Sequence, residues 1–399
     1  MRKIPALSPL PGDLPPDHQP VIIAAQRSAI GRAGGIFASL DVEYLAAPVM
    51  QAVLAEAQIS PNQLDDVILG NAAGPGGNVA RLSSLHAGFP PSIPGVTVDR
   101  QCGSGLEAVM MACHLIMAGA GTTYLAGGVE SQSRAPLRSL PASGTLPAHS
   151  YTRARFSPDT IGDPEMGAAA DTVAKQFNIS RTRQDAFALR SQHRATEARA
   201  AGRFTAEITP VAGQTTDECI RETMTVARLA RLRPAFSKDG TVTVGNACPL
   251  NDGAAALLIT TAAKARSLGH TNALAYIGGA AAGVDPNILG IGPVASTQKL
   301  LKHHTDLHLA DLTHLEFNEA FAAQVLASLD ALGIDETLPN QDGGAIALGH
   351  PFGASGAILV VRLFTQLIRQ NAPADARAMA MIGIGGGQGL TAAFQSTRL

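Results

Sequence analysis

The chain has 399 residues, of which 46% are hydrophobic and 16% are charged, so it can build a large core and is not a disordered protein. The 30 Lys and Arg residues nearly balance the 32 Asp and Glu residues, and aromatic residues make up only 4%, so neither a basic surface nor a base-stacking platform for nucleic acid is expected. Four cysteines in this length exclude a disulfide scaffold, and their spacing matches no zinc site.

The N-terminus is rich in proline, with six in the first twenty residues. It has no continuous apolar stretch, so residues 1–19 are predicted to form a flexible leader and not a signal peptide. No apolar run reaches the ~18 residues of a membrane span. We therefore expect a cytoplasmic protein without a membrane partner.

Short apolar runs alternate with helical patterns up to about residue 130 and again near residue 256. Residues 41–58 place apolar side chains on one helical face. This alternation predicts an α/β fold with a largely parallel sheet covered on both faces. The predicted buried strands are 21–25, 67–71, 122–128 and 256–260.

The alternating pattern of strands and helices stops between residues 130 and 245. Strand signals become rare there, and a polar helix is predicted over 181–201. We interpret 130–245 as a loop domain inserted into an N-terminal half that spans 20–265. The α/β rhythm resumes in a C-terminal half that spans 272–397.

A weak internal repeat relates the two halves. Residues 102–109 (CGSGLEAV) resemble residues 353–360 (GASGAILV), and each segment is followed about twenty residues later by an apolar strand that runs into glycines. A duplication would place two strand-to-helix turns side by side, and such turns hold ligands in α/β folds.

Cys102 falls at the first of these turns, between an alternating strand pattern and a helical one. Backbone N–H groups at a helix N-terminus stabilise a thiolate, so we expect a lowered thiol pKa and acyl transfer through a thioester. The alternative is a small buried cysteine in a tight turn. Cys113, on the apolar face of the following helix, is predicted to be an inert core residue.

His350 and Asn318 are the other candidates. His350 is fixed between a glycine and a proline just before a helix and could activate Cys102 or bind a carbonyl oxygen. Asn318 ends a strand and could position a water, although asparagine also favours helix N-caps. The cluster of His303, His304, Asp306 and His308 resembles a solvated helix end without an open acidic or thiolate partner, so no metal site is predicted. The glycines at 383–389 lack a nucleotide-binding fingerprint.

Taken together, these motifs resemble the thiolase family of acyl-CoA:acetyl-CoA acyltransferases from about residue 20 to 395. The resemblance implies two similar α/β halves in five αβαβα layers with an inserted loop domain. The matching motifs are QCGSGLEAV (101–109), EMG (165–167), LRPAF (232–236), NDGAAA (251–256), NEAFAAQ (318–324), GGAIALGHPFGASGA (343–357) and GGGQG (385–389).

The resemblance also implies roles for single residues. Cys102 matches the nucleophile that becomes acylated, His350 the histidine that activates it, and Asn318 the residue that holds a water in one oxyanion site. The N–H groups of Cys102 and Gly385 match a second oxyanion hole.

Further matches concern coenzyme A. Its thioesters are the implied substrates, without a cofactor, and a homodimer or homotetramer is implied. The implied contacts are Arg221 on the adenine side, Phe236 on the pantetheine side, Met166 and Phe321 around the acyl and pantetheine region, and Cys248 in a binding loop.

One position departs from the family. Where thiolases carry a second cysteine that moves the α-proton, this chain has Gly383, and no cysteine follows Cys248. Cys248 or Glu165 could replace that acid/base, or both could be ordinary variations of a binding loop.

Three functions remain open at this stage. The first is Claisen condensation with acetyl-CoA, or its thiolytic reversal, with atypical activity because of Gly383. The second is decarboxylative or non-carbon acyl transfer, which needs no second cysteine. The third is a non-catalytic acyl-CoA-binding subunit.

Overall fold

The computed structural model describes residues 15–399, so most of the predicted leader lies outside the described residues. The strands are β1 Pro20–Arg27, β2 Gly31–Arg32, β3 Asp66–Gly70, β4 Val96–Val98, β5 Thr123–Ser131, β6 Arg138–Leu140, β7 His149–Tyr151, β8 Asn251–Thr261, β9 Asn272–Gly283, β10 Leu312–Phe317, β11 Arg377–Ile384 and β12 Gln388–Arg398. The α-helices are α1 Val42–Glu56, α2 Val79–His86, α3 Ser104–Met117, α4 Met166–Gln176, α5 Arg181–Ala200, α6 Val226–Ala230, α7 Ala262–Ser267, α8 Gly292–His303, α9 Ala322–Leu332, α10 Ala345–Leu348 and α11 Phe352–Phe364.

The main sheet consists of two groups of strands joined by a narrow seam. Its order is β10-β11-β12-β9-β1-β8-β5-β3-β4, and β9 pairs with β1 through only two residue pairs. Most neighbouring strands are antiparallel, and only β3/β4, β3/β5 and β10/β11 are parallel. The prediction of a largely parallel sheet is therefore wrong, because β8, β9 and β12 return along the sheet without a helical crossover.

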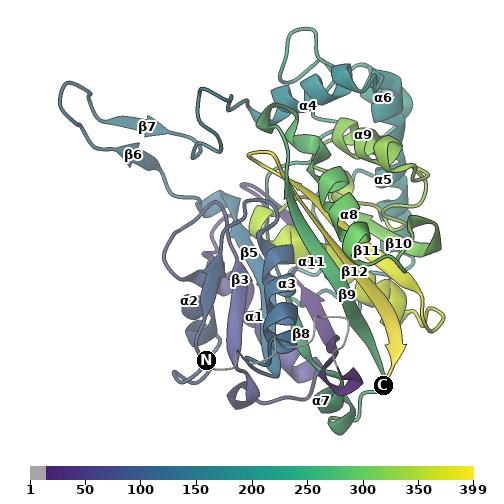
Figure 1. Cartoon of the computed structure of the whole chain (residues 1–399). Coiled ribbons are helices and arrows are strands. Elements are labelled where there is room, and N and C mark those ends of the chain that lie inside the picture. The colour runs from purple at the N-terminus through teal and green to yellow at the C-terminus, as the bar shows by residue number, and fades with distance from the viewer. Residues whose placement is uncertain (1–14) are drawn as a thin grey trace, which may run out of the picture.

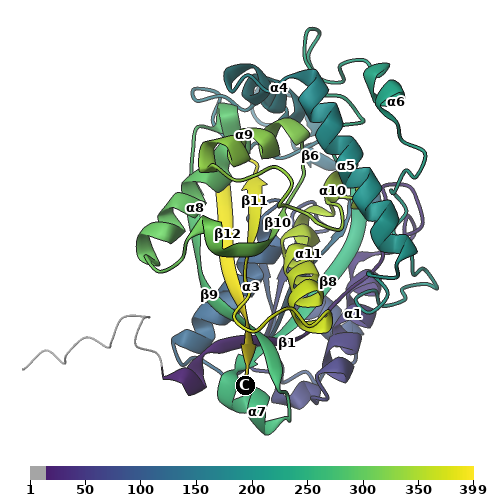
Figure 2. The ribbon, with the colours of Figure 1, turned by 90° about the vertical axis from the view of Figure 1, so that its right-hand side faces the viewer.

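Three hydrophobic clusters define the layers (Figures 1 and 2). One outer cluster packs α1 and α2 against the first group of strands, and the other packs α8 and α9 against the second. The central cluster contains α3 from the N-terminal half and α11 from the C-terminal half. The order is thus αβαβα, which confirms the expected five layers.

Small residues let the two central helices approach closely at their first turns. A Cβ atom added to Gly105 would lie 2.8 Å from both the Gly353 oxygen and the Ala357 nitrogen, and one added to Gly356 would lie 2.3 Å from the Leu106 nitrogen. Only glycine fits such backbone contact. These are the Ser-Gly pairs of the sequence repeat, so the repeat places the Cys102 turn beside the His350 turn.

The inserted region between β5 and β8 contains the β6–β7 hairpin, which projects from the body in Figure 1, and helices α4, α5 and α6. Buried ion pairs attach it to both halves of the chain. Arg27 of β1 lies 2.7 Å from both Glu207 and Asp217, and Glu207 also pairs with Arg362 of α11. Because buried charges require partners, this network fixes the insertion over the central helices.

One apolar segment, Phe352–Arg369, has the length and hydropathy of a membrane span. It is 83% buried inside the protein, because it comprises α11 and the turn that follows. This segment is the core helix of the central layer.

Candidate active site

A strained turn presents Cys102 just before α3. The preceding residue, Gln101, has a φ of 49°, which is uncommon for a residue with a side chain. The Ser104 hydroxyl holds the turn, because it accepts from the Arg100 N–H at 2.9 Å and donates to the Gln101 carbonyl at 2.6 Å. Cys102 retains some exposed surface, so it is accessible at this turn.

The backbone N–H groups of Gly385 and of Cys102 itself lie close enough to the Cys102 sulfur to lower the pKa of its thiol. Burial nevertheless raises the pKa of the thiol to about 12, and these two donors lower it only in part. The expectation of a lowered pKa is therefore wrong, because desolvation outweighs the turn's N–H groups. The structure does bring Cys102 and Gly385 together, as the sequence predicts.

His350 is buried and has a defined tautomer. Its Nδ1 lies 2.6 Å from the Ser355 hydroxyl, and that hydroxyl donates to the Pro351 carbonyl at 2.9 Å. Ser355 must therefore accept from Nδ1–H, which leaves a lone pair on Nε2. Burial lowers the pKa of His350 to about 3, so the imidazole is neutral and its Nε2 can accept a proton.

Asn318 lies at the end of β10, as predicted, and faces the same ring nitrogen. Its amide nitrogen is 3.4 Å from His350 Nε2, and its backbone N–H donates to the Met381 carbonyl. The two side chains therefore direct polar atoms toward one place. A water or a thioester oxygen beside this pair would have a donor in Asn318.

Three further residues that sequence reasoning missed support this arrangement. The side-chain oxygen of Asn251 accepts from the backbone N–H of His350 at 2.8 Å, and the Ser355 hydroxyl orients the imidazole ring. Phe156 packs over the Gly385 loop, since a Cβ atom on Gly385 would lie 2.8 Å from its ring. Asn251 and Ser355 lie inside matched motifs and could have been found there, whereas Phe156 has no local signal.

Met166, Phe236 and Phe321 converge near the start of α4. The rings of Phe236 and Phe321 meet edge to face with centroids 6.0 Å apart, and Phe236 covers Gly167, next to Met166. Phe236 remains 48% exposed. An exposed aromatic face of this kind suits the pantetheine contact predicted for it.

Arg221 lies apart from this aromatic group. It lines a hollow of about 420 Å³ with Arg199 and Arg228. Its backbone N–H donates to Gln192 at 2.7 Å, and its own side chain is exposed. Glu222 also lines this hollow and pairs with Arg199. The adenine-side role of Arg221 stays a prediction.

The two proposed substitutes for the missing acid/base differ in position. Cys248 is half-buried, and burial raises the pKa of its thiol, with a smaller contribution from the neighbouring Cys102 thiol. Glu165 has a side chain that is 72% exposed and paired with Arg153 at 3.2 Å. Cys248 therefore lies in the electrostatic neighbourhood of the nucleophile, whereas an exposed, paired Glu165 is poorly suited to act as a base.

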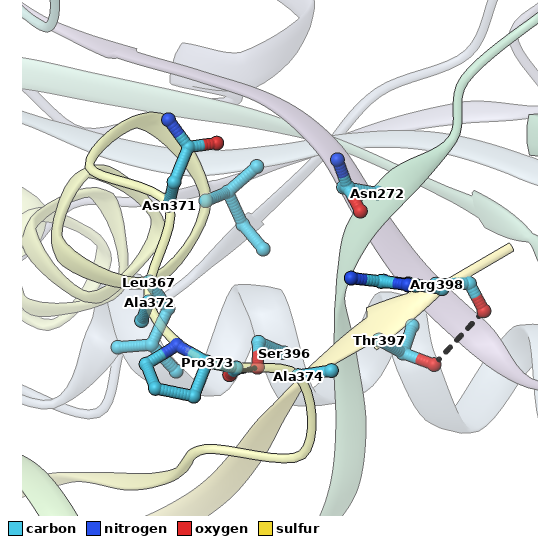
Figure 3. A pocket seen from close by; sticks show the side chains of 10 residues that line it. Asn272, Leu367, Asn371, Ala372, Pro373, Ala374, Ser396, Thr397 and Arg398 are labelled. Carbon is cyan, nitrogen blue, oxygen red and sulfur yellow. Dashed lines mark hydrogen bonds between the residues drawn. The ribbon is translucent and has the colours of Figure 1, made fainter.

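A cavity of about 260 Å³ lies elsewhere (Figure 3). It is lined by Asn272 at the start of β9, by Ser396 and Arg398 at the end of β12, and by the loop 371–374. The Gly385 loop meets the opposite ends of these two strands. The cavity in Figure 3 is therefore remote from Cys102.

Two relatives match the chain over nearly its whole length. YhfS of Bacillus subtilis, named as a provisional acetyl-CoA C-acetyltransferase, is 45% identical over 377 residues, which cover 94% of this chain and 98% of that protein. VraB of Staphylococcus epidermidis, which carries the same provisional name, is 45% identical over 384 residues with the same coverage.

Two solved structures agree with the fold. The Bacillus anthracis acetyl-CoA acetyltransferase gives a TM-score of 0.88 at 37% identity and covers 95% of this chain and 99% of its own. The human mitochondrial 3-ketoacyl-CoA thiolase gives 0.87 at 34% identity, with 96% and 100% covered.

Family models cover both halves. The model described as "Thiolase, N-terminal domain" matches residues 20–263, and "Thiolase, C-terminal domain" matches residues 271–396. With the five-layer fold and the paired turns, these matches show that the chain belongs to the thiolase family, whose members are acyltransferases.

Proposed function

We propose that this chain transfers an acyl group from a coenzyme A thioester onto Cys102 and then to a second coenzyme A substrate. The observation that carries the proposal is the packing of the Cys102 turn against the His350 turn, with the Gly385 N–H close to the Cys102 sulfur. Donors at this place would also stabilise the oxyanion that forms when the sulfur attacks a thioester.

The first step requires proton transfer from Cys102 to His350. With thiol and imidazole pKa values of about 12 and about 3, the resting pair is neutral. The thiol proton therefore moves to His350 Nε2 as the sulfur attacks the thioester carbonyl. The same proton then leaves with the coenzyme A thiol, so the step ends with an acylated Cys102 and a neutral imidazole.

The second step uses the polar site between Asn318 and His350. There the Asn318 amide would donate a hydrogen bond to the thioester oxygen of a second coenzyme A substrate. The α-carbon of that substrate, after losing a proton or CO₂, attacks the acyl carbonyl, and the bond from that carbonyl to the Cys102 sulfur breaks. The same geometry serves the reverse reaction, thiolysis of a 3-oxoacyl thioester. We propose coenzyme A thioesters as substrates and no resident cofactor.

Intact-protein mass spectrometry after mixing with acetyl-CoA tests the proposal. We expect one added acetyl group that maps to Cys102 and is absent from the Cys102→Ala variant. Absence of the adduct from the unaltered protein would overturn the proposal. A non-catalytic acyl-CoA-binding subunit would bind acetyl-CoA without forming the acetyl adduct on Cys102.

A further inference from the structure

Position 383 faces the layer of α9. Along β11, side chains alternate between two hydrophobic clusters. Ala378, Ala380, Ile382 and Ile384 belong to the central cluster with α3 and α11, whereas Met379 and Met381 belong to the outer cluster with α9. Gly383 continues the second series, two residues before Gly385, whose N–H lies near the Cys102 sulfur.

The space above Gly383 contains the side chain of Gln324. A Cβ atom at position 383 would lie 2.7 Å from Gln324 Nε2, with the Gly290 carbonyl next nearest. Gln324 is only 2% exposed, and neither of its amide atoms has a hydrogen-bond partner. It lies in the first turn of α9, close after Asn318 in the chain. A buried and unpartnered amide therefore points at the place where the family resemblance predicts a thiol.

This amide cannot do the work of that thiol. A neutral carboxamide does not accept a proton near neutral pH, so it cannot take one from the α-carbon of acetyl-CoA. It can donate two N–H bonds, and a buried donor without a partner is costly. The site therefore favours a substrate that brings an acceptor group and needs no proton removed.

We propose that Gln324 binds the carboxylate of a 2-carboxyacyl thioester, malonyl-CoA in the simplest case, as the second substrate. The inference rests on the proposed acylation of Cys102. Charge-assisted N–H bonds to a carboxylate would satisfy the Nε2 atom nearest Gly383. Gln324 is thus a substrate-binding residue that selects the second substrate.

The reaction balances without a base at position 383. The bond between the α-carbon and the carboxylate breaks, CO₂ leaves, and the electron pair forms the new carbon–carbon bond to the acyl carbonyl on Cys102. The bond from that carbonyl to sulfur breaks, and the Cys102 thiolate takes one proton from solvent by way of His350. The products are a 3-oxoacyl thioester, CO₂ and the free thiol.

The test follows acetylated enzyme supplied with either malonyl-CoA or acetyl-CoA, measuring acetoacetyl-CoA and release of labelled CO₂. We expect malonyl-CoA to give at least ~10²-fold faster condensation, the scale of a missing acid/base. Equal or faster condensation with acetyl-CoA would overturn the inference. Failure of Cys102 to become acetylated would instead overturn the proposed function.

Variants of Gln324 test the residue itself. Gln324→Ala removes the donor and should raise the KM for malonyl-CoA ~10-fold or more with a smaller change in kcat. Gln324→Glu places a negative charge against the carboxylate and should be worse still. Gln176→Ala, which removes an exposed glutamine at the end of the neighbouring helix α4, is the matched control.

The acetylation assay on Cys102 shows whether each variant is folded. A Gln324→Ala protein that acetylates but keeps the unaltered KM for malonyl-CoA would overturn the role of Gln324. The role of Gln324 would also be overturned if Gln324→Ala and Gln324→Glu had the same KM for malonyl-CoA as the control variant Gln176→Ala.

Discussion

Two sides of the same site differ in how fully their polar atoms are paired. On the acylation side, backbone N–H groups lie near the sulfur of Cys102, and Ser355 and Asn251 hold His350 by hydrogen bonds. On the side of the second substrate, Gly383 has no side chain and the Gln324 amide above it has no partner. The polar groups of the first side are paired within the protein, whereas the Gln324 amide would be paired only by the substrate proposed for it.

This difference separates the two halves of the reaction. Acylation depends on groups that the fold has already oriented, so it should be independent of what the second substrate is. Carbon–carbon bond formation depends on the group that the substrate brings to Gln324. Changes on one side should therefore leave the other half-reaction measurable, and the following experiments use that separation.

The largest effect is expected from Cys102→Ser. A hydroxyl is a far weaker nucleophile than a thiol beside a neutral imidazole, so overall turnover should fall by ~10⁴-fold or more. Steady-state condensation and thiolysis assays measure the loss. Substantial turnover by this variant would mean that the acyl group does not pass through residue 102.

His350→Asn should slow acylation by ~10²–10⁴-fold, because it removes the base that receives the thiol proton. In the unaltered protein the imidazole stays neutral above its pKa of about 3. The rate of Cys102 acetylation should therefore be nearly constant from pH 8 down to pH 5 in rapid-quench measurements. A tenfold fall per pH unit below 6.5 would show that the histidine titrates normally.

The same histidine predicts a pH effect on stability. Between an unfolded pKa near 6.5 and the folded value of about 3, the unfolded chain binds a proton that the native protein does not. His350 therefore reduces stability as the pH falls through this window, by up to about 1.4 kcal/mol per pH unit. Denaturant unfolding at pH 6.5 and 4.5 should show a shallower loss for His350→Asn than for the unaltered protein.

Gly383→Cys tests whether a thiol at position 383, on the side of the second substrate, increases condensation with acetyl-CoA. A thiol there should raise condensation with acetyl-CoA by up to ~10²-fold, because it supplies a proton acceptor. The added side chain must first displace the amide that lies 2.7 Å from its Cβ position. The double variant Gly383→Cys/Gln324→Ala should therefore gain more than the single one. A double variant that gains nothing with acetyl-CoA would show that the missing thiol does not limit that reaction.

Ser355→Ala should have the smallest effect. It removes the acceptor 2.6 Å from His350 Nδ1 and frees the ring to adopt the other tautomer, so acylation should slow by ~10-fold. Ser267→Ala, at an exposed serine that ends α7, provides the matched control. Equal rates for the two variants would show that Ser355 does not orient the histidine.

Local patterns were sufficient to predict the residues that lie at turns. Cys102 and Asn318 each follow a strand and precede a helix, whereas His350 lies between the short helix α10 and α11. The internal repeat correctly placed the Cys102 and His350 turns together. The strands of the first half and helix α5 also match their predicted positions. These features depend on neighbours in the sequence.

Properties that depend on distant neighbours were not predicted. Strand direction depends on which strands pair, so β8 and β12 could not be recognised as antiparallel from their own residues. The Cys102 pKa depends on how deeply the thiol is buried, and the Gly383–Gln324 contact joins segments that are 59 positions apart. Each of these properties results from packing between layers. Local sequence patterns do not specify such contacts between distant segments.

The central layer has a consequence for the architecture as a whole. It is built from one helix of each half, and the sheet seam between the halves has only two residue pairs. Either half alone would expose the apolar face of its own sheet and of α3 or α11, so the chain behaves as a covalently tethered pseudo-dimer. A polypeptide nicked between α7 and β9 should therefore remain associated, with each fragment acting as the folding template of the other.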